Sequence, residues 1–367
     1  MLGRIAAILA LTSMIIACAQ AKPVAETANP APSAVSQSRT LNVMMKNEPF
    51  DLTDTASTRN NFTVAMFLAT LTGQENGAPY ALLSSVPDLN TDTWRVFPDG
   101  TMETTYRLKP GLTWHDGQPL TADDFVFTER LNVARFQMGL SVSSITPAEH
   151  KLIQEVSAPA SDTVVIRWKG LYADADKPTL KVAPKHILEE PLNQGEPQLL
   201  GSNAYWTTGY VGVGPYKLTQ WQQGAFIEGT AFDGYALGRP KIDKVIVSWN
   251  ADPNVVLAGL LGGSTNVAVD SAVQFEQGAI LKDTWGKSGD GAVIFTPSEN
   301  RYLGGQFRPA YVEPKALLDV RVRAATLHAI DRKALADTLL AGEGVISDTP
   351  LVPVDPLFAA VDRAITK

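Results

Sequence analysis

Residues 106–131 read Tyr-Arg-Leu-Lys-Pro-Gly-Leu-Thr-Trp-His-Asp-Gly-Gln-Pro-Leu-Thr-Ala-Asp-Asp-Phe-Val-Phe-Thr-Glu-Arg-Leu. The first four residues alternate between apolar and charged side chains, which predicts a half-buried strand. Pro-Gly at 110–111 and Asp-Gly at 116–117 are turn signals, because proline fixes φ and glycine tolerates positive φ. Thr121 followed by Asp-Asp at 123–124 is typical of a helix N-terminus, and apolar residues then recur at helical spacing. This stretch therefore predicts a strand, a turn, a loop and a helix in quick succession.

Length, charge and cysteine content narrow the class of protein. With 367 residues, 45% of them hydrophobic and 19% charged, the chain is globular and long enough for two or more hydrophobic cores. Its net charge of -7 argues against a nucleic-acid partner, because phosphate binding needs a basic face. The single cysteine, Cys18, excludes an intrachain disulfide and a thiol-rich metal site.

The first 40 residues predict an export signal followed by a tether. Residues 1–17 combine an early arginine, a short apolar run and a final alanine, which is typical of a signal peptide. Ile-Ile-Ala-Cys at 15–18 resembles a lipobox, in which the cysteine is lipidated, although the commonest lipobox has leucine first and a small residue second. A plain signal peptide with an incidental cysteine is the alternative. Residues 18–40 are rich in Ala, Pro, Ser and Gln and predict a disordered tether, which gives a lipid-anchored domain reach from the bilayer.

Hydrophobic periodicity and turn residues predict further elements along the chain. A hairpin is expected around Pro-Asp-Gly at 98–100, and Asp319 and Asp331 are predicted to cap two helices, the second ending at Gly342. The other predictions from these patterns are strands at 41–45, 152–156 and 163–168, a strand ending at Val247, and a helical face shared by Val320, Ala324 and Leu327. Resemblance to one protein family, rather than periodicity, implies a short helix within 182–188, a strand introduced by 212–216, and a helix at 255–261 followed by a turn at 262–264.

Two more segments match landmarks of one protein family. Residues 211–221 read Val-Gly-Val-Gly-Pro-Tyr-Lys-Leu-Thr-Gln-Trp, and residues 319–332 begin Asp-Val-Arg-Val-Arg-Ala-Ala and end Asp-Arg. With residues 106–131, and in this order, they closely resemble the bacterial extracellular solute-binding proteins of family 5, the oligopeptide-, dipeptide- and nickel-binding components of ABC importers. The resemblance extends from about Leu41 to the C-terminus. A phosphate loop is the weaker alternative for residues 211–221, because a third glycine is absent and Pro215 removes an N–H donor.

The resemblance implies an α/β, two-lobed periplasmic-binding-protein-like fold that closes around a ligand like a hinge, with an extra inserted subdomain. Family members continue well beyond the position of Lys367, so the chain is expected to be truncated, with an incomplete second lobe, exposed strand edges and half a core. The absent part would include the acidic residue that pairs with the amino group of a bound peptide. The expected division is a signal peptide at 1–17, a tether at 18–40, a discontinuous first lobe at 41–56 and 205–296, an inserted subdomain at 57–204 and the start of the second lobe at 297–367.

The resemblance also implies a function. We expect a lipid-anchored, periplasmic or extracytoplasmic substrate-binding protein that captures peptides or a similar small solute and delivers it to the permease subunits of an ABC importer. A monomer is expected, with no cofactor, no metal, no nucleic acid and no membrane contact besides the lipid. A peptide-sensing receptor, a periplasmic chaperone and an inactive truncated fragment remain alternatives. Family ligand contacts map loosely, and outside any motif, onto Ser57, Thr58, Asp270, Tyr302 and Gln306.

Catalytic patterns are weak, and no catalytic residue is predicted. The chain has no Gly-x-Ser-x-Gly or His-Glu-x-x-His motif, and its four histidines, at 115, 150, 186 and 328, are widely scattered. His115-Asp116 could be a dyad and Asp123-Asp124 a carboxylate pair. Turn formation explains the first, and a helix N-terminus explains the second. Arg321 and Arg323 are expected to make ion pairs on a solvated helix rather than to bind phosphate.

Overall fold

The computed structural model describes residues 38–52, 66–67, 81–140, 151–176, 181–269, 271–296 and 304–365. The predicted signal peptide, Cys18 and nearly all of the tether lie outside these residues. Most of the helix-like segment between Phe62 and Leu71 also lies outside them, and only Met66 and Phe67 are described, as helical.

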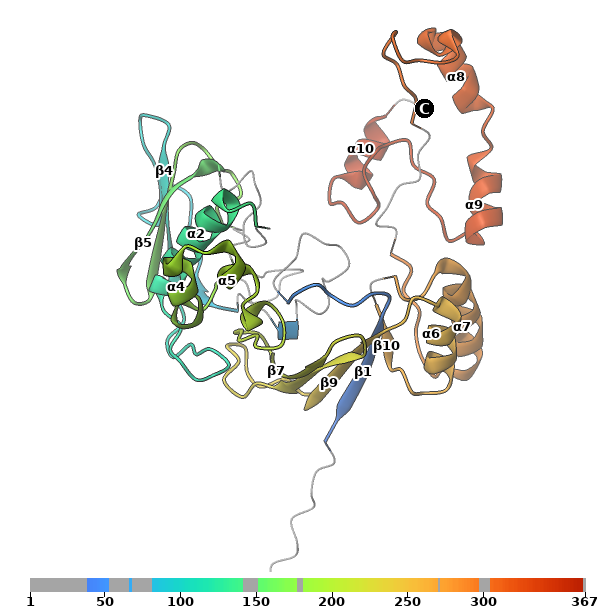
Figure 1. The fold of residues 1–367 in the computed structure, drawn as a ribbon. Coiled ribbons are helices and arrows are strands. Elements are labelled where there is room, and N and C mark those ends of the chain that lie inside the picture. Colours follow the sequence, from blue (N-terminus) through green and yellow to red (C-terminus); the bar gives the residue numbers. More distant parts are fainter. Residues whose placement is uncertain are drawn as a thin grey trace, which may run out of the picture. The chain divides into compact units, whose positions relative to one another are not determined.

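A mixed five-stranded sheet joins segments from distant parts of the chain (Figure 1). Its order is β10-β1-β9-β8-β7, and β1 is parallel to both of its neighbours. The register pairs Met45 with Trp249 and Met44 with Ala268. Val245 and Val247 of β9 are buried, and Ile246 between them is partly buried, so the apolar run in the sequence has cover on both faces of the strand. The strands are β1 (Thr40–Met45), β7 (Tyr216–Gln222), β8 (Phe226–Ala231), β9 (Lys244–Trp249) and β10 (Val267–Ala268).

Two helices follow the parallel strands of this mixed sheet. Helix α6 (Pro253–Leu261) connects β9 to β10, and α7 (Phe275–Ser288) follows β10. They form a small core of their own in which Val256 and Leu281 are buried. The predicted helix at 255–261 thus begins two residues earlier, because Asp252 accepts a hydrogen bond from Asn254 N–H and proline occupies the first turn.

The second sheet is antiparallel and has the order β2-β4-β6-β5, with β3 also paired to β4. The predicted hairpin is confirmed, since Phe97 N–H donates to the carbonyl of Thr101 across the turn. Every second residue of β4, from Met102 to Leu108, is buried, as the alternation in the sequence predicts. The strands are β2 (Leu83–Ser85), β3 (Trp94–Val96), β4 (Met102–Leu108), β5 (Ile153–Ala160) and β6 (Thr163–Trp168).

Helix α2 (Ala122–Gln137) packs against β5 and against α4 (Lys185–Gln194). The helix expected within 182–188 starts at Lys185, after Pro184, and runs on to Gln194. It ends where Gly195 takes a left-handed conformation with φ 72°. Helix α5 (Pro197–Gly201) and the short 3-10 helix η1 (Ala204–Trp206) lead into the mixed sheet.

Residues 304–365 contain η2 (Lys315–Leu318), α8 (Val320–His328), α9 (Arg332–Leu340) and α10 (Phe358–Ala364). Both predicted caps are confirmed. Asp319 accepts a hydrogen bond from Arg321 N–H and Asp331 accepts one from Ala334 N–H, each at 2.8 Å. No residue of these helices is buried, and the expected apolar face of α8 is open, with Val320 63% and Leu327 66% exposed. In the described part of the chain, no helix combines the length and apolar character needed to cross a membrane.

Candidate functional site

The parallel strands of the mixed sheet define the candidate site. Strand β1 lies between β9 and β10, and the chain passes through α6 from one side of β1 to the other. In open α/β sheets, ligands bind outside the carboxyl ends of the strands, at the point where the strand order reverses. The carboxyl ends of β1, β9 and β10 are therefore the edge at which we expect a ligand.

Backbone and side-chain hydrogen bonds fix the loops at this edge. Asn250 N–H donates to the carbonyl of Met45 at 2.9 Å, and Val269 N–H donates to that of Met44 at 3.0 Å. Asn250 Oδ1 also accepts from Asp252 N–H, and Asp252 caps α6. The loops after β9 and β10 are thus held to the end of β1.

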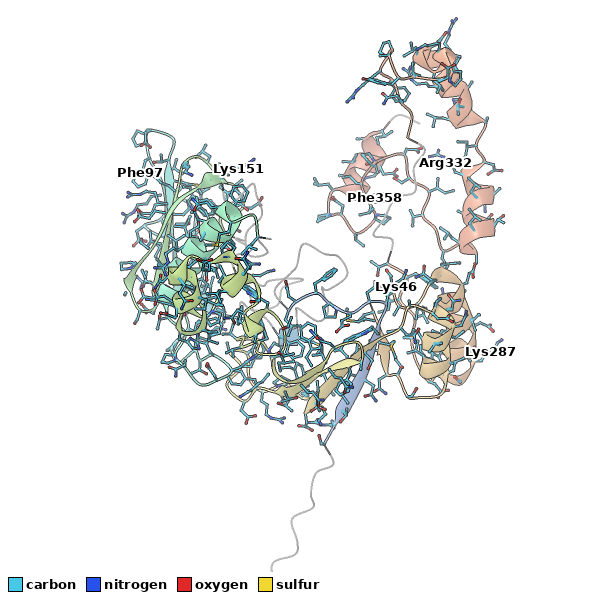
Figure 2. The ribbon with its side chains drawn as sticks, viewed as in Figure 1. Lys46, Phe97, Lys151, Lys287, Arg332 and Phe358 are labelled. Carbon is cyan, nitrogen blue, oxygen red and sulfur yellow. The ribbon has the colours of Figure 1, made fainter. Side chains whose placement is uncertain are left out.

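Lys46 is the first residue beyond β1 and is exposed (Figure 2). Its ammonium group is a hydrated point charge with three donors, suited to a carboxylate or a carbonyl. Glu48, two residues further on, is already engaged, because its carboxylate accepts hydrogen bonds from Trp221 Nε1–H and Gly224 N–H. Lys46 therefore offers a charged group at this edge that a ligand could reach.

Four of the five predicted ligand contacts lie outside the described residues. Ser57 and Thr58 belong to the segment that follows β1, and Asp270 directly follows Val269 at the end of β10. Tyr302 lies between the described ranges as well. Gln306 is exposed, and its Oε1 accepts a local hydrogen bond from Arg308 N–H at 2.9 Å. All five contacts remain predictions.

His115 and Asp116 do not form a dyad. His115 is 4% exposed; its Nδ1 accepts from Gly212 N–H at 3.1 Å, and its Nε2 lies 3.0 Å from the carbonyl of Gly214. These two bonds select the neutral tautomer with hydrogen on Nε2, and burial lowers the pKa of His115 to about 4. Asp116 instead pairs with His186, with 2.8 Å between Oδ2 and Nε2. The link between His115 and the Gly-x-Gly-Pro-Tyr segment was not predicted from the sequence.

Asp123 and Asp124 have separate surroundings. Asp124 is 5% exposed and accepts hydrogen bonds from Thr121 N–H at 3.0 Å and Lys185 N–H at 3.1 Å, so one carboxylate caps both α2 and α4. Burial raises the pKa of Asp124, and the two backbone hydrogen bonds oppose that rise. Asp123 is exposed beside a polar recess of about 290 Å³ lined by Gln118, Pro119, Thr121, Asp123, Asp124, Lys185, His186 and Glu189.

The arginines of the third landmark have protein partners. Arg321 forms an ion pair with Asp319 at 2.6 Å. Arg323 Nη1 donates to the carbonyls of Leu317 and Leu318 at 2.9 Å, and its guanidinium lies over an aromatic ring. The expected ion pair is confirmed for Arg321, whereas the contacts of Arg323 are with backbone carbonyls and a ring. Among the described residues, no three His, Cys, Asp or Glu side chains are grouped so that they could hold a metal ion.

Comparison with known proteins identifies the class. The family of bacterial extracellular solute-binding proteins, family 5 (its "Middle" region), matches residues 85–364. The chain belongs to this family of solute-binding proteins.

Individual relatives agree with this assignment. Oligopeptide-binding protein AppA of Bacillus subtilis is 27% identical over 312 residues, which is 82% of this chain and 51% of AppA. The dipeptide-binding protein of Escherichia coli is 26% identical over 284 residues, which is 73% of this chain and 50% of that protein. The chain thus spans about half the length of these curated relatives.

Solved structures share the two-lobed fold. The oligopeptide-binding protein of Thermus thermophilus, complexed with a pentapeptide, gives a TM-score of 0.64 at 21% identity, covering 88% of this chain and 60% of that one. Bacillus subtilis AppA in complex with a nonapeptide gives 0.61 at 23% identity, covering 86% and 58%. The expected fold class, an α/β periplasmic-binding-protein-like fold, is confirmed.

Proposed function

We propose that this chain is the lipid-anchored substrate-binding component of an ABC importer, which captures peptides or a similar small solute between two lobes and passes it to the permease. The observation that carries the proposal is the family match across residues 85–364. The parallel-strand edge of β1, β9 and β10 supports it, because such edges bind ligands in open α/β sheets. Lys46 at this edge suits the carboxylate or the main-chain carbonyls of a peptide.

Native mass spectrometry and thermal unfolding of the purified full chain test ligand capture. We expect co-purifying peptide mass to be released on unfolding. We also expect a matching synthetic peptide at a hundred times its Kd to stabilise the protein by about 2.7 kcal/mol. The peptide should be recovered unchanged, since a binding protein does not turn over its ligand. Cleavage of the peptide would instead support a hydrolase. A full chain that carries no co-purifying small molecule and binds no peptide pool would refute the proposal.

The lipid anchor rests on Cys18 and the apolar run before it. Metabolic labelling with a radioactive fatty acid tests it. Label should enter the wild-type protein and be absent from Cys18→Ala. Equal labelling of both proteins would exclude this anchor, and an unlabelled wild type would favour the plain signal peptide.

We also propose that residues 41–56 and 205–296 form one lobe, that 57–204 form an inserted subdomain, and that 297–367 begin a second lobe. The two sheets support this division, because they share no strand. Strands β1 and β7 to β10 form the mixed sheet of the proposed lobe, and β2 to β6 form the antiparallel sheet of the proposed subdomain. Limited proteolysis tests it. Early cuts should fall near residues 57, 204 and 297, and early cuts within β4 or β9 would contradict it.

A further inference from the structure

Residues 46–52, which we call the edge loop, pass along the carboxyl ends of the strands in the mixed sheet. The loop leaves the end of β1, and the carboxylate of Glu48 then accepts a hydrogen bond from Gly224 N–H at 3.0 Å. Gly224 lies in the turn between β7 and β8. The register of β8 with β9 pairs Phe226 with Ser248, which places this turn beside the carboxyl end of β9. The edge loop therefore lies at the edge where we expect a ligand.

Contacts within the protein fix the second half of the edge loop. Glu48 is held at the turn between β7 and β8, Pro49 is buried, and Leu52 is fully buried in the core beneath the mixed sheet. Asp51 lies near the guanidinium of Arg135, where burial lowers the pKa of the arginine and the charge of Asp51 opposes that shift. The backbone of residues 48–52 is thus set by protein groups.

Two side chains of the edge loop are nevertheless exposed. Phe50 is 85% exposed, although Pro49 and Leu52 on either side of it are buried. Lys46 is exposed as well, and within the described part of the chain it forms no hydrogen bond and no ion pair. Removing an aromatic ring from water is favourable, and an ammonium group has three hydrogens to donate. Both groups can therefore bind a ligand without giving up a contact within the protein.

The charge and spacing of these side chains define what they can bind. The two carboxylates of the loop, Glu48 and Asp51, already interact with protein groups, so the charge that the loop offers to a ligand is the positive charge of Lys46. Four peptide units separate Lys46 from Phe50, so their Cα atoms lie at most about 14 Å apart. An extended peptide rises about 3.3 Å per residue, and a tetrapeptide spans that distance.

We propose that Lys46 and Phe50 form a two-part ligand subsite: the Lys46 ammonium pairs with a carboxylate of the bound peptide, and the Phe50 ring packs against an apolar side chain within about four residues of that carboxylate. This inference rests on the proposed function and narrows it, because it favours peptides that are both acidic and apolar. It assigns selectivity to two described side chains on a loop that the protein itself holds in place.

Five pools of tetrapeptides test the two halves of the subsite separately. Four pools have random sequences without acidic side chains, and they combine a free or an amidated C-terminus with one phenylalanine or with no aromatic residue. The fifth pool is amidated and contains one aspartate, which distinguishes a side-chain carboxylate from a C-terminal one. Binding to the full chain is measured by equilibrium dialysis and read by mass spectrometry.

Each variant has a matched control on the same chain. Lys46→Met removes the charge at the carboxyl edge, and Lys241→Met removes an exposed charge that precedes the amino end of β9. Phe50→Ser removes the ring, and Phe136→Ser removes a ring that is 71% exposed on α2. All four side chains are exposed, so circular dichroism should show the same unfolding transition in every variant.

We expect Lys46→Met to weaken binding of the free-acid pools about tenfold and that of the amidated pools without aspartate by less than about twofold. Phe50→Ser should weaken the phenylalanine pools about tenfold and the others by less than about twofold, and Phe50→Leu should restore most of the loss. Both controls should bind every pool as the wild type does.

The pattern of losses decides the inference. A loss in Lys46→Met that falls on the aspartate pool instead of the free-acid pools would assign the carboxylate to a side chain and support the pairing. In either variant, a loss spread equally over all pools, or no loss, would overturn the inference and leave peptide capture intact. A wild type that binds none of the pools would overturn the inference at its premise, which is peptide capture.

Discussion

Replacing Gly212 by alanine should destabilise the protein strongly, although it adds a single methyl group. An ideal Cβ at this position lies 2.3 Å from the carbonyl oxygen of Phe67 and 2.7 Å from Cε1 of Tyr210. The first of these atoms is backbone and Tyr210 is 3% exposed, so neither moves freely. Overpacking of this kind typically costs about 1–3 kcal/mol. The shift also strains the hydrogen bonds of Gly212 to His115, each worth about 1 kcal/mol.

We therefore expect the free energy of unfolding to fall by about 3 kcal/mol in Gly212→Ala, measured by urea denaturation followed by circular dichroism. Gly286→Ala is the matched control. Gly286 lies inside α7, no atom is within 4 Å of the Cβ that alanine would add, and alanine is the better helix former. The free energy of unfolding of Gly286→Ala should rise by about 0.5–1 kcal/mol. If the free energy of unfolding of Gly212→Ala lies within about 0.5 kcal/mol of the wild-type value, the carbonyl of Phe67 does not approach Gly212 as closely as described.

Three further predictions concern caps and protonation. In urea denaturation, Asp124→Ala should lower the free energy of unfolding by about 2 kcal/mol, because one carboxylate caps two helices. Asp123→Ala, at an exposed position, should lower it by less than about 0.5 kcal/mol. Between pH 6.5 and 4 the free energy of unfolding of the wild type should fall by up to about 3 kcal/mol more than that of His115→Asn. The reason is that histidine in the unfolded chain binds a proton in this range, whereas buried His115, with a pKa of about 4, stays neutral. The same dependence of stability on pH in both proteins would contradict this prediction. Asp319→Ala should speed amide exchange in α8 but leave the main urea transition unchanged, because no residue of α8 is buried.

Local signals predicted local structure well. The alternation from Met102 to Leu108 reports one buried face of β4, and Pro-Asp-Gly at 98–100 closes the hairpin. Asp319 and Asp331 cap helices within three residues of themselves, so their partners are visible in the sequence. Where the apolar pattern depended on a distant partner, prediction was weaker. The face of α8 containing Val320 has helical spacing but is exposed in the described structure.

The connections between segments could not be predicted in the same way. His115 and Gly212 are 97 residues apart, and Asp124 and Lys185 are 61 apart. Each residue had an adequate local explanation, a turn for the histidine and a helix N-terminus for the aspartate, and nothing in those explanations calls for a remote partner. The signal that could have indicated a remote contact is the glycine at 212, because a residue without a side chain lets two backbones approach closely.

These connections change what residues 106–131 do in the molecule. Within this stretch the His115 ring forms hydrogen bonds with Gly212 and Gly214, and Asp116 pairs with His186. Asp124 caps α4 as well as its own helix. All three polar side chains are thus used to join the stretch to later segments of the chain. A stretch used in this way can remain recognisable in proteins with different ligands, because its side chains are committed to the fold. Selectivity should then depend on residues at the carboxyl ends of β1 and β10, where Lys46 is exposed and where the segments containing Ser57, Thr58 and Asp270 begin.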